Sequence, residues 1–133
     1  MNTKDNQNSI ESIIKTIKQE INAVAESNFD IYSSILTKDS EFMPPNSLPL
    51  SGEELLFWLK DFMENFNVEW IEFLHKNIEA VESLGFHEYS FRWRLIPKKG
   101  GDTKEHKGKG IHILRKESDG SWKIAREIWN NSI

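Results

Sequence analysis

A β-hairpin near the end of the sequence constrains the fold more than any other feature. Two runs with strand-like composition, residues 108–116 and 122–131, flank the pair Asp119-Gly120. An Asp-Gly pair between such runs is a strong short-range signal for a hairpin, because glycine adopts the positive φ of a tight turn without steric cost. The second run has polar and apolar residues on both of its faces, so we expect residues 122–131 to form a central strand.

Period-two alternation assigns the side chains of this last strand to two faces. We expect the face turned toward the interior to carry Ala125, Glu127 and Trp129. We expect the outer face to carry a second group, which consists of Trp122, Ile124 and Ile128 with Ile111 and Ile113 from the preceding strand. A large exposed apolar patch marks an interaction surface, so this group predicts a homodimer formed through the outer face of the sheet.

Helical periodicity is confined to the first half of the chain. From Ser9 onward apolar residues recur at spacings of three and four, which predicts a long amphipathic helix after a disordered segment 1–8. A short helix is expected at residues 29–36, and a third helix from Ser51 to about Asn65. From Val68 onward the sequence has the pattern of long strands. Helices followed by antiparallel strands indicate a single α+β domain over residues 9–133.

The composition excludes several functional classes. The net charge of −4 gives no basic footprint for nucleic acid, and we interpret the lysines between residues 98 and 109 as a solvated hairpin tip. The chain contains no cysteine, which excludes disulfides and thiolate chemistry. The N-terminus lacks the apolar region of a signal peptide, and no apolar run approaches the length of a membrane span. A cytoplasmic location is therefore the default expectation.

The histidines and glycines form no cofactor motif. His75, His87, His106 and His112 form neither a His-x-His nor a His-x-x-x-His pair and fall on different predicted strands, so we expect no metal site. We interpret Gly100-Gly101, Gly108 and Gly110 as turn and bulge glycines, because they do not form a phosphate-binding loop. We therefore expect no cofactor.

Several short segments together resemble one known family. They are Met43-Pro44-Pro45-Asn46 before Ser51-Gly52, Leu95-Ile96-Pro97 with Gly100-Gly101, Gly108-Lys109, and the ending Asp-Gly-Ser-Trp-Lys-Ile-Ala-Arg-Glu-Ile-Trp-Asn at 119–130. These segments are similar to those of SnoaL-like proteins, which belong to the nuclear transport factor 2-like, or ketosteroid isomerase-like, superfamily. The resemblance spans about residues 9–131. It implies a cone-shaped fold, in which three N-terminal helices pack on a strongly curved, mostly antiparallel sheet around a pocket, and a dimer.

The resemblance also implies where an isomerase of this superfamily would hold its catalytic groups. The carboxylate base would fall at Met43 or Pro44 and the helix-borne tyrosine near Ile21, and none of these side chains transfers a proton. A second oxyanion donor would fall near His112, within a register error of one residue, and a pocket tryptophan would match Trp129. The missing base argues against isomerisation of the ketosteroid type.

Glu127 and His112 are the candidate catalytic residues. Both are expected on the Trp129 side of neighbouring strands, where burial raises the pKa of a carboxyl group and suits it to general acid–base catalysis. Two structural alternatives remain open. Glu127 forms an ion pair with Arg94 or beside Arg126, or Glu127 and His112 form a buried pair that only holds the strands together.

Aromatic residues predict the walls of a pocket, although those at helical spacing are equally typical of a core stripe. The expected ligand-binding residues are Tyr32, Trp58, Phe62, Phe91, Trp93 and Trp129. We expect a domain that binds a small hydrophobic or aromatic molecule. The alternative is a small-molecule isomerase, cyclase or lyase that uses Glu127 and His112 for proton transfer. Two polar groups within hydrogen-bond distance at the cavity floor would favour the enzyme, and a uniformly apolar cavity would favour the binding domain.

Overall fold

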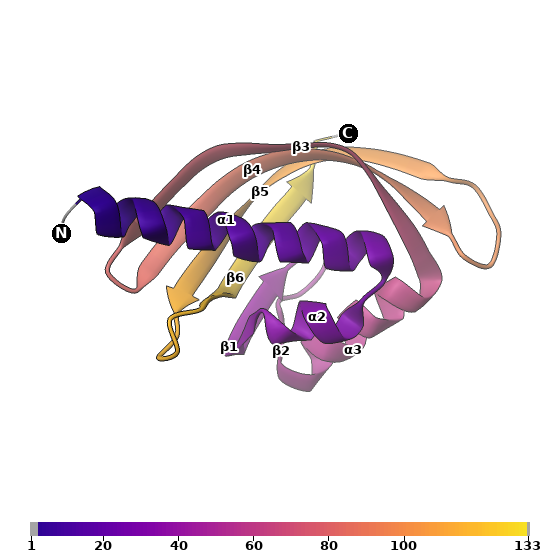
Figure 1. Ribbon diagram of the computed structural model, residues 1–133. Coiled ribbons are helices and arrows are strands. Elements are labelled where there is room, and N and C mark those ends of the chain that lie inside the picture. The colour runs from indigo at the N-terminus through magenta and orange to yellow at the C-terminus, as the bar shows by residue number, and fades with distance from the viewer. Residues whose placement is uncertain (1–2, 133) are drawn as a thin grey trace.

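The first helix packs lengthwise against the sheet because its buried residues form one stripe. In the computed structural model, which describes residues 3–132, α1 spans Thr3–Glu26 (Figure 1). Its buried residues follow spacings of three and four, as an amphipathic helix requires, and they are Ile13, Thr16, Ile17, Glu20, Ala23 and Val24. The helix begins before the expected Ser9, so residues 3–8, which were predicted to be disordered, are helical. Met1 and Asn2 lie outside the described residues.

Two further helices and two short strands precede the long strands. Asn28 caps α2 (Phe29–Ser34) by accepting a hydrogen bond from the Ile31 amide at 3.1 Å. The chain then forms β1 (Leu36–Met43), β2 (Leu50–Ser51) and α3 (Gly52–Asn65). The bounds of α2 and α3 therefore lie within two residues of those predicted, whereas α1 begins six residues before its predicted start.

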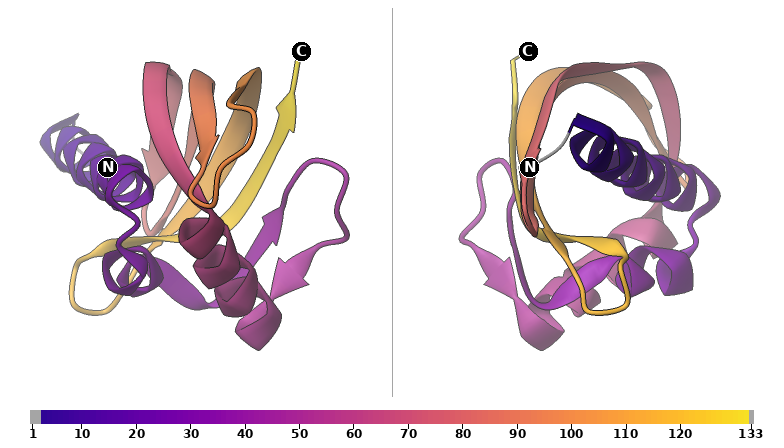
Figure 2. Two further views of the ribbon diagram at one scale, coloured as in Figure 1. Left: turned by 90° about the vertical axis from the view of Figure 1, so that its right-hand side faces the viewer. Right: turned by 60° about the vertical axis from the view of Figure 1, so that its left-hand side comes forward.

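Four long strands complete a mixed six-stranded sheet. They are β3 (Phe66–Val81), β4 (Leu84–Pro97), β5 (Lys104–Lys116) and β6 (Trp122–Asn131), and the strand order is β2-β1-β6-β5-β4-β3. Within residues 3–132, β1 and β6 pair in parallel, and the other neighbouring strands pair antiparallel. The α+β class and the central position predicted for the last strand are confirmed. Figure 2 shows the long strands bending around α1.

A β-bulge in β6 corrects the predicted faces of that strand. Ile113 pairs with Arg126, but Leu114 pairs with Ile124, so Ala125 is an extra residue in β6. The bulge reverses the alternation, and Trp122 and Ile124, predicted on the outer face, are 3% and 0% exposed in the core. Ile111 and Ile128 are exposed, as predicted.

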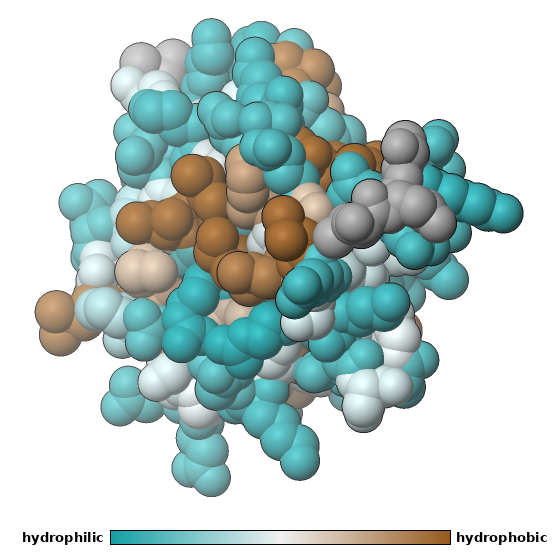
Figure 3. All heavy atoms as spheres, turned by 90° about the vertical axis from the view of Figure 1, so that its left-hand side faces the viewer, coloured by the Kyte–Doolittle hydropathy of each residue, from teal (hydrophilic) through white to brown (hydrophobic). Residues whose placement is uncertain are grey.

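Hydrophobic residues also gather at the end of the molecule that carries the β3–β4 turn. Figure 3 shows them near the centre of a mostly hydrophilic face. Val81 and Leu84 are the exposed hydrophobic residues that flank this turn. Neither residue lines the cavity described below, so this patch is separate from the candidate site. No helix within residues 3–132 is both long enough and apolar enough to cross a membrane.

Candidate functional site

A row of polar side chains crosses the centre of the sheet because strand register places them opposite one another. His87 on β4 pairs with His112 on β5, and His112 pairs with Glu127 on β6. The His112 Nε2 atom lies 2.8 Å from the Glu127 Oε2 atom. Glu127 and His112 are 5% and 0% exposed, so the predicted pair forms inside the protein.

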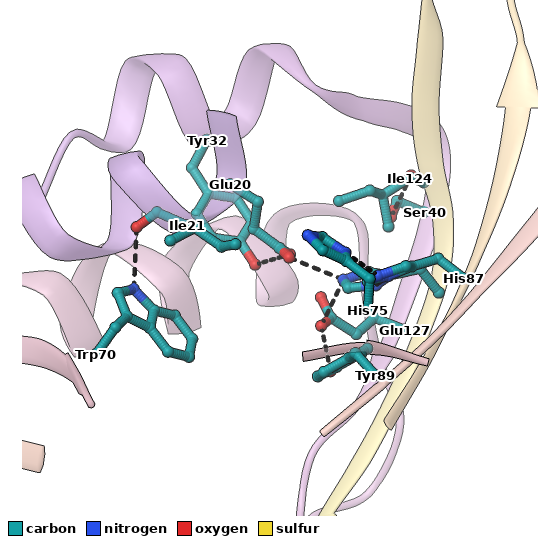
Figure 4. A network of polar contacts seen from close by, with 11 residues as sticks. Glu20, Ile21, Tyr32, Ser40, Trp70, His75, His87, Tyr89, Ile124 and Glu127 are labelled. Carbon is teal, nitrogen blue, oxygen red and sulfur yellow. Dashed lines mark hydrogen bonds and ion pairs between the residues drawn. The ribbon is translucent and has the colours of Figure 1, made fainter. Parts of the chain in front are cut away.

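Glu20 completes the row from the opposite side. It extends from α1, and its Oε1 atom lies 2.8 Å from the same His112 Nε2 atom (Figure 4). Tyrosine hydroxyls donate to both carboxylates: Tyr32 Oη to Glu20 Oε2 at 2.6 Å, and Tyr89 Oη to Glu127 Oε2 at 2.8 Å. Three of the four carboxylate oxygens therefore have partners. The fourth, Glu127 Oε1, is buried without a hydrogen-bond partner among residues 3–132.

Gly110 makes room for one of these tyrosines. It lies between Tyr89 and Trp129 in the sheet register, and a Cβ atom added to it would lie 2.5 Å from the Tyr89 Oη atom. Any other residue at this position would displace the hydroxyl from Glu127. Gly108 likewise leaves space for the Phe91 ring, because a Cβ atom added to it would lie 2.7 Å from the Phe91 Cζ atom. The interpretation of both as turn or bulge glycines is therefore wrong, since they lie within β5 and admit aromatic rings.

Burial and charge set the protonation of this cluster of Glu20, His112 and Glu127. Burial raises the pKa of Glu127, and the charge of Glu20 raises it further, to about 7. Burial also raises the pKa of Glu20, but the charge and hydrogen bond of His112 outweigh it and lower that pKa to about 2. Burial lowers the pKa of His112, but the charges of Glu127 and Glu20 outweigh it and raise that pKa to about 10. Glu127 is thus the member that gains and loses a proton near neutral pH.

The cluster forms the floor of an aromatic cavity of about 230 Å³. Glu20, Glu127, Tyr32 and Tyr89 line its polar end, whereas His112 lies behind them. The six residues predicted as ligand contacts all line this one cavity: Tyr32, Trp58, Phe62, Phe91, Trp93 and Trp129. Their rings contact one another, as in the stacked pairs of Phe62 with Trp58 and with Trp93. Contact with a ligand stays a prediction for all six.

Comparison with solved structures identifies this architecture, whereas no protein-family model and no curated protein matches the sequence. A conserved protein from Planctomyces limnophilus superposes with a TM-score of 0.85 at 22% identity, over 94% of this chain and 98% of the other. A ketosteroid isomerase-like protein from Erwinia carotovora atroseptica gives 0.84 at 17% identity, over 93% and 96%. A candidate dehydratase of the nuclear transport factor 2-like family from Streptomyces avermitilis gives 0.84 at 14% identity, over 96% and 98%.

The chain has the nuclear transport factor 2-like fold. Membership of the SnoaL-like subfamily stays a prediction, because the neighbours share the fold at low identity. Within this fold, Met43 lies on β1 opposite Ile128, and Pro44 follows it at the cavity. The carboxylates of this chain enter the cavity from α1 and β6 instead.

The sequence reasoning found part of this site in the nuclear transport factor 2-like fold and missed the rest. Glu127 and His112 were predicted together, and the alternative ion pair of Glu127 with Arg94 is wrong, since Arg94 pairs with Glu69 at 2.8 Å. Glu20, Tyr89 and His87 were missed. Glu20 carried a detectable signal, because a charged residue three positions after Ile17 lies in the apolar stripe of its helix.

The three buried titratable residues also resemble a metal-binding group in their spacing. Glu20, His112 and Glu127 each offer one ligand atom, and these atoms lie within 4.8 Å of one another. However, His112 Nε2 already lies between the two carboxylates at hydrogen-bond distance, and the charges of both favour its protonated form. A cation at this place would have to displace the Nε2 proton, so metal binding would compete with the protonation of His112. These contacts fit a cluster that shares protons between imidazole and carboxylate groups.

Proposed function

We propose that this protein is a proton-transfer enzyme that acts on a small aromatic or hydrophobic molecule, in the manner of an isomerase, dehydratase or lyase. The observation that carries the proposal is Glu127 Oε1, which is buried in the cavity wall without a partner among residues 3–132. A carboxyl group with a pKa near neutral pH and an unpartnered oxygen, on a residue that lines a cavity, has the properties of a general acid–base group. The chemistry named for the structural neighbours is consistent with this class.

Each member of the cluster has a distinct role in this proposal. Glu127 exchanges a proton with the bound molecule through Oε1. Glu20 stays ionised and, through its charge, keeps the pKa of Glu127 above its usual value. His112 and Tyr89 both contact Glu127 Oε2 at 2.8 Å and so hold this carboxyl group in place, which leaves its other oxygen for the bound molecule. His112 and Tyr89 are therefore positioning residues.

Two unpartnered polar atoms of the cavity indicate the chemistry of the bound molecule. Trp93 Nε1 is a buried donor that lacks a hydrogen-bond partner within residues 3–132, and Glu127 Oε1 is the corresponding acceptor. Both residues line the cavity. Buried polar groups are costly when unpaired, so a ligand that supplies an oxygen acceptor to Trp93 and an acidic hydrogen to Glu127 is favoured. A cavity of about 230 Å³ suits a compact molecule of one or two fused rings.

Hydrogen–deuterium exchange of an aromatic ketone tests the proposal directly. 2-Tetralone carries acidic hydrogens beside its carbonyl oxygen, and mass spectrometry measures their replacement in deuterated water. We expect the wild-type protein to accelerate this exchange. A positioned acid–base group contributes about 10²–10⁴ in rate, so Glu127→Gln should slow the exchange by that factor while keeping the shape of the side chain.

Glu88→Gln is the matched control, because Glu88 is an exposed carboxylate on strand β4 of the same sheet. It should exchange 2-tetralone at the wild-type rate. Equal acceleration by the wild type and Glu127→Gln would contradict the role of Glu127. Binding of aromatic ketones and alcohols without any acceleration would favour the alternative, a domain that only binds a small hydrophobic ligand.

A homodimer remains part of the proposal. The apolar pair Ile111 and Ile128 lies in register on adjacent strands, and both side chains are exposed. Exposed apolar groups on a sheet face favour association through that face. Sedimentation equilibrium should give a mass of twice 15.6 kDa, and a monomer in Ile128→Lys would locate the interface. A specific dimer with a dissociation constant of about 1 μM or below would be mostly formed at tens of micromolar, so a monomeric wild-type protein at roughly that concentration would contradict the dimer.

A further inference from the structure

Three histidine rings form a continuous line from the carboxylate cluster to the surface. His112 Nδ1 lies 3.0 Å from His87 Nδ1, and His87 Nε2 lies 2.8 Å from His75 Nδ1 (Figure 4). His112 and His87 are fully buried, whereas His75 is exposed on β3, the edge strand of the sheet. The proposed roles of Glu127, Glu20 and Tyr89 do not require His87 or His75. This line of rings leaves the cluster on the side away from the cavity, since neither His87 nor His112 lines the cavity.

When His112 is doubly protonated, one arrangement of protons satisfies every contact in the line. In this arrangement His112 Nε2–H donates to Glu20 Oε1, with Glu127 Oε2 also 2.8 Å away, and Nδ1–H donates to His87 Nδ1. His87 then carries its proton on Nε2 and donates it to His75 Nδ1. His75 in turn carries its proton on Nε2. Burial and the charge of His112 lower the pKa of His87 to about 3, which is consistent with a neutral ring between two partners.

We propose that His87 and His75 relay protons between His112 and solvent. In the outward direction, the proton on His112 Nδ1 moves to His87 Nδ1, the proton on His87 Nε2 moves to His75 Nδ1, and His75 Nε2 releases its proton to water. One proton leaves, His112 keeps the proton on Nε2, and His87 and His75 change tautomer. The reverse steps carry one proton inward and restore the first arrangement.

The relay gives the cluster an exit for protons while the cavity is occupied. A molecule in the cavity covers Glu127 and separates it from water on that side. When Glu127 accepts a proton it loses its negative charge, and His112 loses part of the attraction that holds its own proton. The relay lets His112 release that proton through His87. The inference rests on the proposed proton-transfer function, but its test does not require a substrate.

Nuclear magnetic resonance of the free, ¹⁵N-labelled protein tests the relay. Long-range ¹H–¹⁵N spectra report which nitrogen of each ring is protonated, and we expect Nε2–H on both His87 and His75. Exchange of the His112 Nδ1 proton with water is the second readout. His75→Phe keeps the ring contacts to His87 and Phe73 but has no nitrogen. We expect it to slow the exchange by about 10²-fold, the lower end of the contribution of a positioned proton-transfer group.

Two further variants separate the relay from a loss of structure. His75→Ala removes the ring and opens the exposed site to water, which can accept directly from His87, so its exchange should stay near the wild-type rate. Lys76→Gln changes the neighbouring exposed residue and should leave exchange unaltered. Backbone amide exchange in β5 and β6 should be equal in all variants. The relay would be overturned if His75→Phe exchanged the His112 Nδ1 proton at the wild-type rate, or if His75→Ala slowed this exchange as much as His75→Phe does. It would also be overturned if the spectra showed two neighbouring rings with no proton on either of the nitrogens that face each other. The deuterium exchange of 2-tetralone would still test Glu127.

Discussion

The floor and the wall of the cavity are built by different means. The floor comes from α1, β5 and β6, and its residues Glu20, His112 and Glu127 are at most 5% exposed. His112 lies 2.8 Å from each carboxylate, in a hydrogen bond with Glu20 and an ion pair with Glu127. The wall comes mainly from α3, β3 and β4, and its rings pack at centroid distances of 5 to about 6 Å, as in the contacts of Trp70 with Trp93 and of Phe62 with Trp58. Charged contacts therefore hold the side chains of the floor in place, whereas the side chains of the wall are held by the packing of their rings.

This difference predicts different tolerances to substitution. A buried ion pair that loses one partner leaves an uncompensated charge, which is strongly destabilising. Aromatic rings that contact one another can be exchanged for rings of similar volume at a smaller cost in the free energy of unfolding. Substitutions in the floor should therefore affect stability first, and conservative substitutions in the wall should affect ligand affinity first.

The largest expected effect is the loss of stability in Glu20→Leu. His112 and Tyr32 both lose their partner on α1, so the free energy of unfolding should fall by about 3–5 kcal/mol. The wall variant Trp58→Phe should lose less than about 1.5 kcal/mol. Urea unfolding followed by circular dichroism measures both values. A loss in Glu20→Leu no greater than that in Trp58→Phe would remove the distinction between floor and wall.

The next effect is a loss of stability at alkaline pH. The folded pKa of His112 is raised to about 10, so its contribution to stability is fully present below its ordinary pKa of 6.5 and disappears as the pH rises toward 10. Glu127, whose pKa is raised to about 7, adds a decline between pH 4.5 and 7. His87, whose pKa is lowered, opposes that decline up to pH 6.5.

The decline should therefore be clearest between pH 7 and 9, a window set by the pKa values of Glu127 and His112. For one proton its slope is at most about 1.4 kcal/mol per pH unit. Urea unfolding at a series of pH values measures it, and ring proton chemical shifts of His112 show whether this residue is the cause. If the free energy of unfolding were constant between pH 7 and 9 and the pKa of His112 were close to its ordinary value of 6.5, charged contacts would not stabilise the floor.

The smallest expected effect concerns the wall. Trp93→Phe keeps an aromatic ring and removes the buried donor Nε1. The affinity for 2-tetralone should fall by a factor that corresponds to one hydrogen bond, about 0.5–1.5 kcal/mol, with little change in unfolding. Calorimetric titration measures the affinity, and 1,2,3,4-tetrahydronaphthalene, which lacks the carbonyl oxygen, serves as the matched ligand. Equal losses for both ligands would show that shape alone, rather than the indole N–H, accounts for binding.

The sequence predicted the features that depend on regular periods. The apolar stripe of α1, the Asp-Gly hairpin and the central position of β6 follow from spacing and turn chemistry, and the structure confirms them. The proximity of Glu127 and His112 also follows from this hairpin, because a short turn fixes the register of the two strands that it joins.

The features that sequence reasoning missed depend on irregularities or on distant segments. Ala125 forms the bulge, and alanine has no property that marks it as an extra residue in a strand. The pairing of His87 with His112 depends on the length of the loop between β4 and β5, and a glycine-containing loop of this kind fits several registers. Glu20 reaches the cluster only because α1 lies lengthwise on the sheet, a tertiary arrangement that helical periodicity alone does not specify.

The bulge at Ala125 divides β6 into two segments that are out of phase. Before the bulge, the side chains of Trp122 and Ile124 are buried in the core. After it, the side chains of Glu127 and Trp129 line the cavity. A regular strand of the same length that kept Trp122 and Ile124 in the core would turn Glu127 and Trp129 toward solvent, although every functional side chain would still be present in the sequence. The site therefore depends on the bulge as strictly as on residue type.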